Sequence, residues 1–209
     1  MIKNLSQILI TDGKEDIPPL IQESISNVRA CFQDCKYTLY DNEKIIDLMK
    51  DNFDSETLKA YKKLKPYAYK SDLAKYCITY LKGGWYIDIT IKFSSFLLGK
   101  AINLPENIDF LGFKDFGDGL RPSTPLSYNL QNSVFYSNPK NPIIEKAIKL
   151  VIENCKDENI GLTPVCPTGP GVLGRSLAVF GAKDTHIIGI FMPLTPLHEN
   201  KNRSYILPD

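Results

Sequence analysis

The chain has 209 residues, of which 43% are hydrophobic and 23% charged, a composition that is ordinary for one globular domain and excludes a fibrous or disordered protein. With 25 basic and 24 acidic residues, no overall charge attracts nucleic acid, so we expect no nucleic-acid partner and only local anion sites. No stretch reaches the roughly 18 apolar residues of a membrane-spanning helix, and the five cysteines form no CxxC pair. The sequence therefore predicts a single domain over residues 1–209 in a reducing compartment such as the cytoplasm, with docking onto a membrane left open.

Strands and helices alternate along the chain, which is typical of an α/β domain. Strands are expected at residues 5–10, 37–40, 85–91, 108–113, 133–136 and 185–190. Helices are expected to begin at the prolines 18 and 19, to cover 45–49, to run from 54 or 55 to about 64, and to cover 69–81 and 142–152. Gly83 and Gly84 end the helix over 69–81, and the tail from Pro193 is predicted to be irregular.

The segment WYIDITI, residues 85–91, alternates with period two and predicts a strand with Tyr86, Asp88 and Thr90 on one face. A carboxylate inside a β-branched strand is costly unless a cation compensates for its charge. Mg²⁺ or Mn²⁺ is such a cation, because hard divalent ions prefer carboxylate oxygen and bridge proteins to diphosphates. Alternatively, Asp88 lies at a solvated strand end, and the residues alone favour neither interpretation.

Other polar residues are ambiguous when taken singly. Asp72 fits a capping or dipole role near the start of its helix, and Lys75, one turn later, adds only a few tenths of a kcal/mol by pairing with it. His186 is expected to be a packed strand residue, whereas His198 is either a metal ligand or a surface residue. The sequence TGPG, residues 168–171, fits a loop that approaches an oxyanion or a sugar hydroxyl, but it also fits an ordinary turn.

The order of these segments resembles that of the glycosyltransferases with a DXD sugar-binding motif. This group is related to glycosyltransferase family 32 and includes capsular polysaccharide synthesis proteins, yeast initiating mannosyltransferases and clostridial glucosylating toxin domains. The similarity is strongest over residues 71–91, where SDLAKYCITYLKGGWYIDITI resembles SDLLRYxxLYxxGGIYLDxDV. Similar segments also occur at YTLYDN (37–42), QNSVFYSNPKNPII (131–144) and CPTGPGVL (166–173), with a looser similarity at His198 and at Ser204-Tyr205.

The resemblance implies a GT-A fold, with a mixed central sheet flanked by helices that binds a nucleotide sugar along the carboxyl ends of its strands. It implies that Asp72 contacts sugar hydroxyls, that Asp88 lies at the metal–diphosphate bridge, and that Asn132 completes the catalytic residues. The residues expected to bind the donor are Thr11, Asp72, Lys75, Tyr86, Ile87, Asp88, Thr90, Lys201, Arg203, Ser204 and Tyr205. Those expected on the acceptor side are Asn132, Gly169, Pro170 and Gly171.

Two positions depart from the family pattern. Thr90 replaces the second Asp of the DXD motif, so the resemblance implies a metal held by Asp88 and His198 with only a weak contribution from Thr90. Lys75 stands where the family usually has arginine, so the charge is kept but the bidentate fork is lost.

The expected function is therefore transfer of a hexose from a UDP- or GDP-sugar to a glycan or other hydroxyl acceptor, as in polysaccharide biosynthesis. The resemblance implies retention of configuration, with Mn²⁺ or Mg²⁺ as the cofactor. One alternative is a nucleotide-sugar-binding module with little turnover, which Thr90 and Lys75 favour. The other is a phosphatase or phosphotransferase of the DxDxT type, which requires its motif on the first strand and an aspartate at position 90.

Overall fold

The computed structural model of the protein describes residues 2–11, 16–93, 106–115, 129–157, 167–180, 183–193 and 203–206. The strands are β1 (Asn4–Ile8), β2 (Lys36–Tyr40), β3 (Gly84–Ile87), β4 (Phe110–Asp115), β5 (Leu130–Ser137), β6 (His186–Pro193) and β7 (Arg203–Ile206). The helices are α1 (Pro19–Cys31), α2 (Asn42–Asn52), α3 (Ser55–Lys63), α4 (Tyr67–Lys82), α5 (Pro142–Lys156) and α6 (Pro170–Phe180).

The strands form one mixed sheet in the order β2-β1-β3-β5-β4-β6-β7. Strand β1 runs parallel to both β2 and β3, whereas β5 is antiparallel to both β3 and β4. Strand β6 is parallel to β4 and antiparallel to β7. The mixed sheet flanked by helices confirms the expected fold class.

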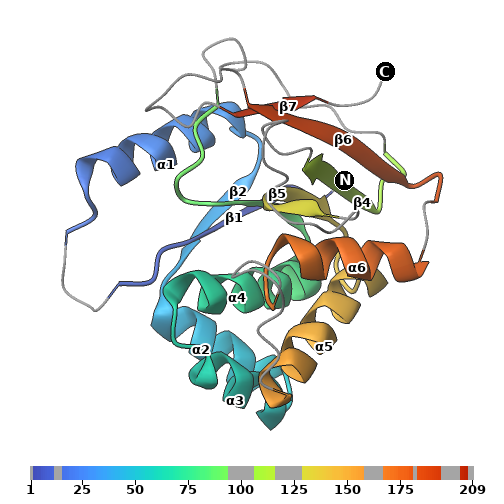
Figure 1. The fold of residues 1–209 in the computed structure, drawn as a ribbon. Coiled ribbons are helices and arrows are strands. Elements are labelled where there is room, and N and C mark those ends of the chain that lie inside the picture. The colour runs from blue at the N-terminus through green and yellow to red at the C-terminus, as the bar shows by residue number, and fades with distance from the viewer. Residues whose placement is uncertain are drawn as a thin grey trace.

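Helices cover both faces of the sheet, and each face has its own apolar core (Figure 1). Helix α1 covers one face, where Val28 and Cys31 pack with Trp85 and Ile87. Helices α2 to α6 lie on the other face, in the larger cluster that contains the buried side of α4. Within the described ranges, no helix is long and apolar enough to cross a membrane.

The parallel pairing of β1 with β3 determines where the polar residues of the 71–91 segment lie. Because Ser6 is paired with Tyr86, the residues that follow β1 and those that follow β3 leave the sheet at the same edge. Helix α4 ends immediately before β3, at Gly83, whose φ of 62° is left-handed. The helix that carries Asp72 is therefore joined directly to the strand that leads to Asp88.

Two expectations about strands were wrong. Strand β3 ends at Ile87 rather than at residue 91, because the chain turns after Asp88, whose carbonyl accepts the Ile91 N–H at 3.0 Å. The apolar spacing of this segment serves packing under α1, since Ile91 and Phe93 belong to the cluster that contains Phe32. The tail expected to be irregular contains strand β7, which pairs with β6.

A prediction follows for the junction between α4 and β3. Gly84 has a φ of 93°, and a Cβ atom at this position would collide with the backbone oxygen of Asn4 on the neighbouring strand. We expect Gly84→Ala to lower the free energy of unfolding by about 2 kcal/mol or more, as measured by urea denaturation. Gly112→Ala is the control, because there the new Cβ meets the edge of the Phe110 ring instead of backbone. Equal losses for the two variants would contradict this account.

Candidate active site

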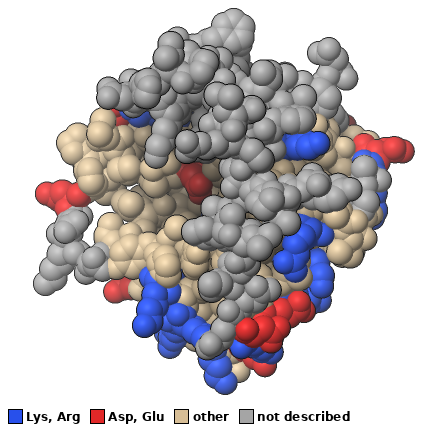
Figure 2. Space-filling view, viewed as in Figure 1, with Lys and Arg blue, Asp and Glu red and all other residues tan. Residues whose placement is uncertain are grey.

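A pocket of about 620 Å³ opens at the edge of the sheet where β1 and β3 end. Its lining comes from the ends of β1 and β3, the first half of α4, the start of β5 and the first residue of α6. The lining residues are Ile8, Leu9, Ile10, Tyr67, Ala68, Ser71, Asp72, Lys75, Tyr86, Asp88, Ile89, Thr90, Asn129, Gln131, Asn132, Ser133 and Pro170. Figure 2 shows acidic atoms within a hollow on one face of the molecule, and the acidic residues of the pocket are Asp72 and Asp88.

Lys75 lies at the centre of the polar groups in this pocket and is only 2% exposed. Its Nζ is 3.0 Å from Asp88 Oδ1 and 3.1 Å from Asp72 Oδ1. It also donates to the main-chain oxygen of Asn132 at 3.2 Å. Three oxygens thus surround the ammonium group, two as hydrogen-bond acceptors and Asp72 Oδ1 as an ion-pair partner, and helix α4 is joined through Lys75 to β3 and β5.

Asp72 faces this network instead of capping its helix. Helix α4 begins at Tyr67 after Pro66, without a side-chain cap, so Asp72 lies beyond the first turn. Its Oδ1 accepts from Asn132 Nδ2 at 2.8 Å, and its Oδ2 accepts from the buried Thr168 hydroxyl at 2.7 Å. The capping interpretation of Asp72 is therefore wrong, and its pairing with Lys75 is a buried interaction.

Two tyrosines complete the network from the core side. The Tyr86 hydroxyl donates to Asp88 Oδ1 at 2.8 Å, and the Tyr86 ring lies 4.9 Å from Lys75 Nζ, within the range of a cation–π contact. The Tyr76 hydroxyl donates to the carbonyl of Gly169 at 3.3 Å and accepts from Asn132 Nδ2 at 3.3 Å. The segment before α6 is therefore held against α4 and β5 by hydrogen bonds.

The charges in the network support one another. Burial alone would lower the pKa of Lys75, but the nearby Asp88, Tyr86 and Asp72 outweigh it, and the pKa of Lys75 is raised well above its ordinary value. Burial, with the charge of Asp88, raises the pKa of Tyr86 well above its usual range. Both shifts favour a charged Lys75 and a protonated Tyr86 at neutral pH.

Asp88 combines the two interpretations that the sequence left open. It follows the last residue of β3, and its side chain is 31% exposed, so it lies at a strand end. Its Oδ1 is nevertheless bound by Lys75 and Tyr86, which anchor the carboxylate. In the described ranges no hydrogen bond reaches Asp88 Oδ2, so this oxygen remains available on the side chain that lines the pocket.

Most of the expected site residues meet in this pocket, but some do not. Asp72, Lys75, Tyr86, Asp88, Thr90, Asn132 and Pro170 line it. The Ile87 side chain is buried in the apolar cluster beneath α1, so only its backbone is near the site. Thr11 is exposed and is not part of the lining. Gly169 lies just before α6, and Gly171 is buried in its first turn.

The expected residues from the C-terminal tail are only partly described. His198 and Lys201 lie outside the described residues. Arg203, Ser204 and Tyr205 lie on β7, at the edge of the sheet, and are separated from β3 by β5, β4 and β6. Their contact with a donor therefore stays a prediction.

The sequence interpretation missed the polar start of β5. Asn129, Gln131 and Ser133 line the pocket together with Asn132, and all four are buried. The signal was present in the sequence, because NLQNS places polar side chains at successive positions of a strand whose later residues are apolar. Such residues in a buried strand require hydrogen-bonding partners. Asn132 finds them in Asp72 and Tyr76, and Ser133 donates to Gln131.

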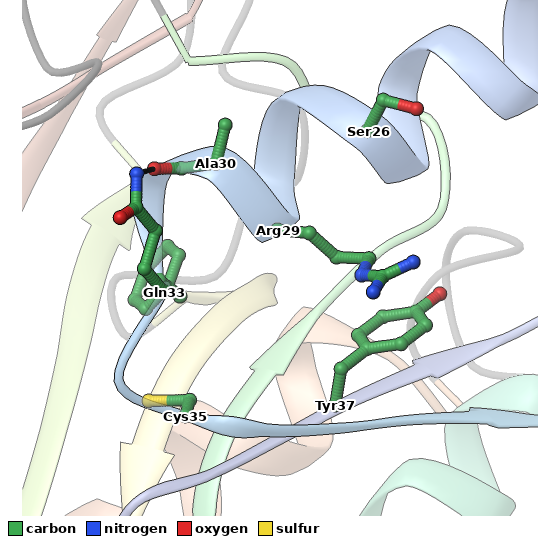
Figure 3. A pocket seen from close by; sticks show the side chains of 7 residues that line it. Ser26, Arg29, Ala30, Gln33, Cys35 and Tyr37 are labelled. Atoms are coloured by element: carbon green, nitrogen blue, oxygen red, sulfur yellow. Dashed lines mark hydrogen bonds between the residues drawn. The ribbon is translucent and has the colours of Figure 1, made fainter.

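A second cavity, of about 650 Å³, lies between α1 and the edge strand β2. Figure 3 shows the Arg29 side chain reaching over the ring of Tyr37, with the guanidinium carbon 5.3 Å from the ring centroid. The Tyr37 hydroxyl donates to Gln7 Oε1 at 3.1 Å, and Gln7 Nε2 donates to the carbonyl of Asp88 at 3.4 Å. This contact chain supports the backbone behind Asp88, and we assign it a structural role.

The fold and the pocket define an α/β protein with a polar site at the carboxyl ends of parallel strands. Residues 18–101 match the family described as "Glycosyltransferase sugar-binding region containing DXD motif". A relative in Acanthamoeba polyphaga mimivirus, an uncharacterized glycosyltransferase, is 30% identical over 149 residues, which cover 71% of this chain and 55% of that protein. Over residues 18–101, which include Asp72, Lys75 and Asp88, the chain is therefore similar to the DXD-type glycosyltransferases.

A solved structure shares the fold. The PaToxG glycosyltransferase aligns with a TM-score of 0.60 at 16% identity, over 85% of this chain and 69% of that chain. At this identity the likeness shows the fold alone, and it agrees with the GT-A-like arrangement of sheet and helices.

The Thr168–Asp72 contact gives a prediction about stability. Thr168→Val keeps the shape of a fully buried side chain but leaves Asp72 Oδ2 without its hydrogen bond. Because the acceptor is a buried carboxylate, we expect a loss of about 1.5–3 kcal/mol in the free energy of unfolding. The control is Ser176→Ala, which removes another buried hydroxyl that bonds only to the helical carbonyl of Val172. We expect a loss below about 1 kcal/mol for it; a Thr168→Val loss no larger than the control's contradicts the prediction.

Proposed function

We propose that the protein is a glycosyltransferase that moves a hexose from a UDP- or GDP-sugar to a glycan or other hydroxyl acceptor. The observation that carries the proposal is a set of hydrogen-bond acceptors left open in the pocket at the ends of β1 and β3. Asp88 Oδ2 and the side-chain oxygen of Asn132 have no hydrogen bond within the described ranges, and Asn129 Oδ1 is buried without a partner. A hydroxyl-rich ligand such as a sugar supplies the donors that these acceptors need.

The roles of the residues follow from their contacts. In this proposal Asn132 accepts from a sugar or ribose hydroxyl and Asp88 faces the diphosphate end of the donor, while Asp72 fixes the Asn132 amide through its Nδ2. Fixing these groups before the donor binds lowers the cost of orienting it. Transfer breaks the bond between the sugar C1 and the diphosphate oxygen, and the nucleoside diphosphate leaves with the bonding electrons. The acceptor oxygen forms the new bond to C1, and its proton passes to the departing diphosphate. Retention of configuration and a polysaccharide acceptor are carried over from the family resemblance.

The donor set fits a divalent metal that takes most of its ligands from the donor. No cluster of three His, Cys, Asp or Glu side chains suited to a metal occurs among the residues that the structure describes. Asp88 Oδ2 offers one hard oxygen, and Thr90, exposed at the same edge, offers a neutral one. Asp88 would hold the ion, with Thr90 and the predicted ligand His198 completing the protein's share. Such an ion, when bound, would stabilise the negative charge on the leaving diphosphate.

The proposal is tested by titrating the protein with UDP- and GDP-hexoses in the presence of Mn²⁺, using isothermal calorimetry. Saturable binding of one nucleotide sugar, together with slow release of free sugar, supports a transferase. Failure to bind any of them rejects the proposal.

We place the protein in the cytoplasm, since the cysteines at 31, 35, 77 and 155 are free thiols.

A second candidate function is a nucleotide-sugar-binding module with little turnover. It is favoured by Thr90, which leaves the metal without a second carboxylate, and by Lys75, whose ammonium group is held by two carboxylates and a carbonyl of the protein. Measuring donor hydrolysis separates the two candidates, because a transferase passes some sugar to water whereas a binding module leaves the donor intact.

Asp88→Asn tests the central carboxylate. The amide keeps the size of the side chain, and Asp72 remains to pair with Lys75, so we expect the fold to persist with a Tm near that of the wild type. Sugar release from the donor should fall by at least about a hundredfold, because the charge facing the diphosphate end of the donor is lost. Asp47→Asn is the matched control, since Asp47 is an exposed residue of α2. Unchanged turnover in Asp88→Asn would remove this residue from the site.

A further inference from the structure

Lys75 occupies the position that a bound cation takes in a carboxylate site. Its ammonium group is surrounded by Asp72 Oδ1, Asp88 Oδ1 and the main-chain oxygen of Asn132, at 3.0 to 3.2 Å. It is also 98% buried, as its exposure of 2% implies. The group is thereby enclosed by oxygen atoms of the protein, two of which accept hydrogen bonds from it.

The contacts of the carboxylate oxygens show which oxygen is left to bind a ligand beside the Lys75 ammonium. Asp72 Oδ1 accepts from Asn132 and forms an ion pair with Lys75, Asp72 Oδ2 accepts from Thr168, and Asp88 Oδ1 accepts from Lys75 and Tyr86. In the part of the chain that the structure describes, Asp88 Oδ2 is the carboxylate oxygen of this network without such a bond. Two carboxylates and one ammonium give the network a net charge of −1.

We propose that the Lys75 ammonium makes the free protein a poor ligand for divalent metal, so that the metal enters together with the diphosphate of the donor. An ion on Asp88 Oδ2 would lie close to the ammonium on the other oxygen of the same carboxylate, and like charges at that distance repel. One carboxylate oxygen does not repay the loss of water from Mg²⁺ or Mn²⁺. A diphosphate brings the further negative charge and oxygen ligands that outweigh the repulsion.

The role of Lys75 is thus that of a positioning residue that also sets the order of binding. It holds Asp88 with one oxygen open, and it prevents Asp72 and Asp88 from closing together on a metal ion. The part of this inference that concerns the diphosphate rests on the proposed function, whereas the part that concerns metal binding by the free protein does not.

The experiment is a titration of the protein with Mn²⁺, in which free Mn²⁺ is followed by electron paramagnetic resonance. Without nucleotide, we expect weak binding to the wild type and binding at least about tenfold tighter to Lys75→Met, because a like charge has been removed from beside Asp88. Lys82→Met, which removes an exposed lysine from the last turn of the same helix, should behave as the wild type. If Lys75 only supported the structure of the site, its replacement would weaken Mn²⁺ binding. A gain in Mn²⁺ affinity therefore distinguishes electrostatic repulsion by Lys75 from a purely structural role.

The site of the gain is checked with Lys75→Met/Asp88→Asn, in which the tighter binding should disappear. If Lys75→Met does not fold, Lys75→Gln serves instead, since its amide donates to the carboxylates without carrying a charge. Equal or weaker Mn²⁺ binding in the folded neutral variant overturns the inference, as does a gain that survives the loss of Asp88.

A second arm adds UDP or GDP. Either nucleotide should tighten Mn²⁺ binding to the wild type by at least about tenfold beyond the Mn²⁺–nucleotide complex in solution, and should tighten it less in Lys75→Met. An equal enhancement in both proteins overturns the proposed order of binding. If neither nucleotide binds the wild type, the proposed function fails, while the comparison without nucleotide still decides what Lys75 does to the metal site.

Discussion

The buried ion network of Lys75, Asp72 and Asp88 is the constraint on which the rest of the site depends. An ammonium group that is almost wholly removed from water is tolerated only when its charge and all its N–H bonds are matched. Meeting this requirement brings together one helix and two strands, because Asp72 and Lys75 lie on α4, Asp88 follows β3, and the third acceptor is the backbone of Asn132 on β5. The same contacts that satisfy the lysine therefore also build the walls of the pocket.

The mixed topology of the sheet makes this arrangement possible. Parallel pairing of β1 and β3 places their carboxyl ends at one edge, which is where ligands bind in open α/β sheets. Antiparallel pairing of β5 with β3 then brings the beginning of β5 to that edge, with Ile87 opposite Val134. As a result, the pocket is lined by two strand ends and one strand start, and the polar residues 129–133 face the residues that follow β3.

Much of the fold was accessible from the sequence because apolar periodicity reports burial directly, as in helix α4, where the spacing of Leu73, Tyr76 and Cys77 matched the buried face. The site was harder to predict, since the energy of the Asp72–Lys75 pair depends on its surroundings. On an exposed helix, an Asp–Lys pair at this spacing stabilises the helix by only a few tenths of a kcal/mol. Here the pair is buried and Lys75 also contacts Asp88, so the pair lies at the centre of the site. The end of β3 was missed for a related reason: isoleucines at 89 and 91 favour a strand locally, whereas packing beneath α1 determines where the chain turns.

The departures from the family pattern at positions 75 and 90 are best understood together. Thr90 removes one negative charge from the site relative to a DXD motif, and Lys75 provides a compact cation in place of a planar guanidinium. A lysine ammonium fits between two carboxylates and a carbonyl, whereas an arginine in the same space would direct its remaining donors outward. Under the proposed function the two substitutions act in one direction, because each leaves fewer protein groups to bind a metal and a diphosphate. In that proposal the site relies on the donor itself to supply the charge that holds the metal.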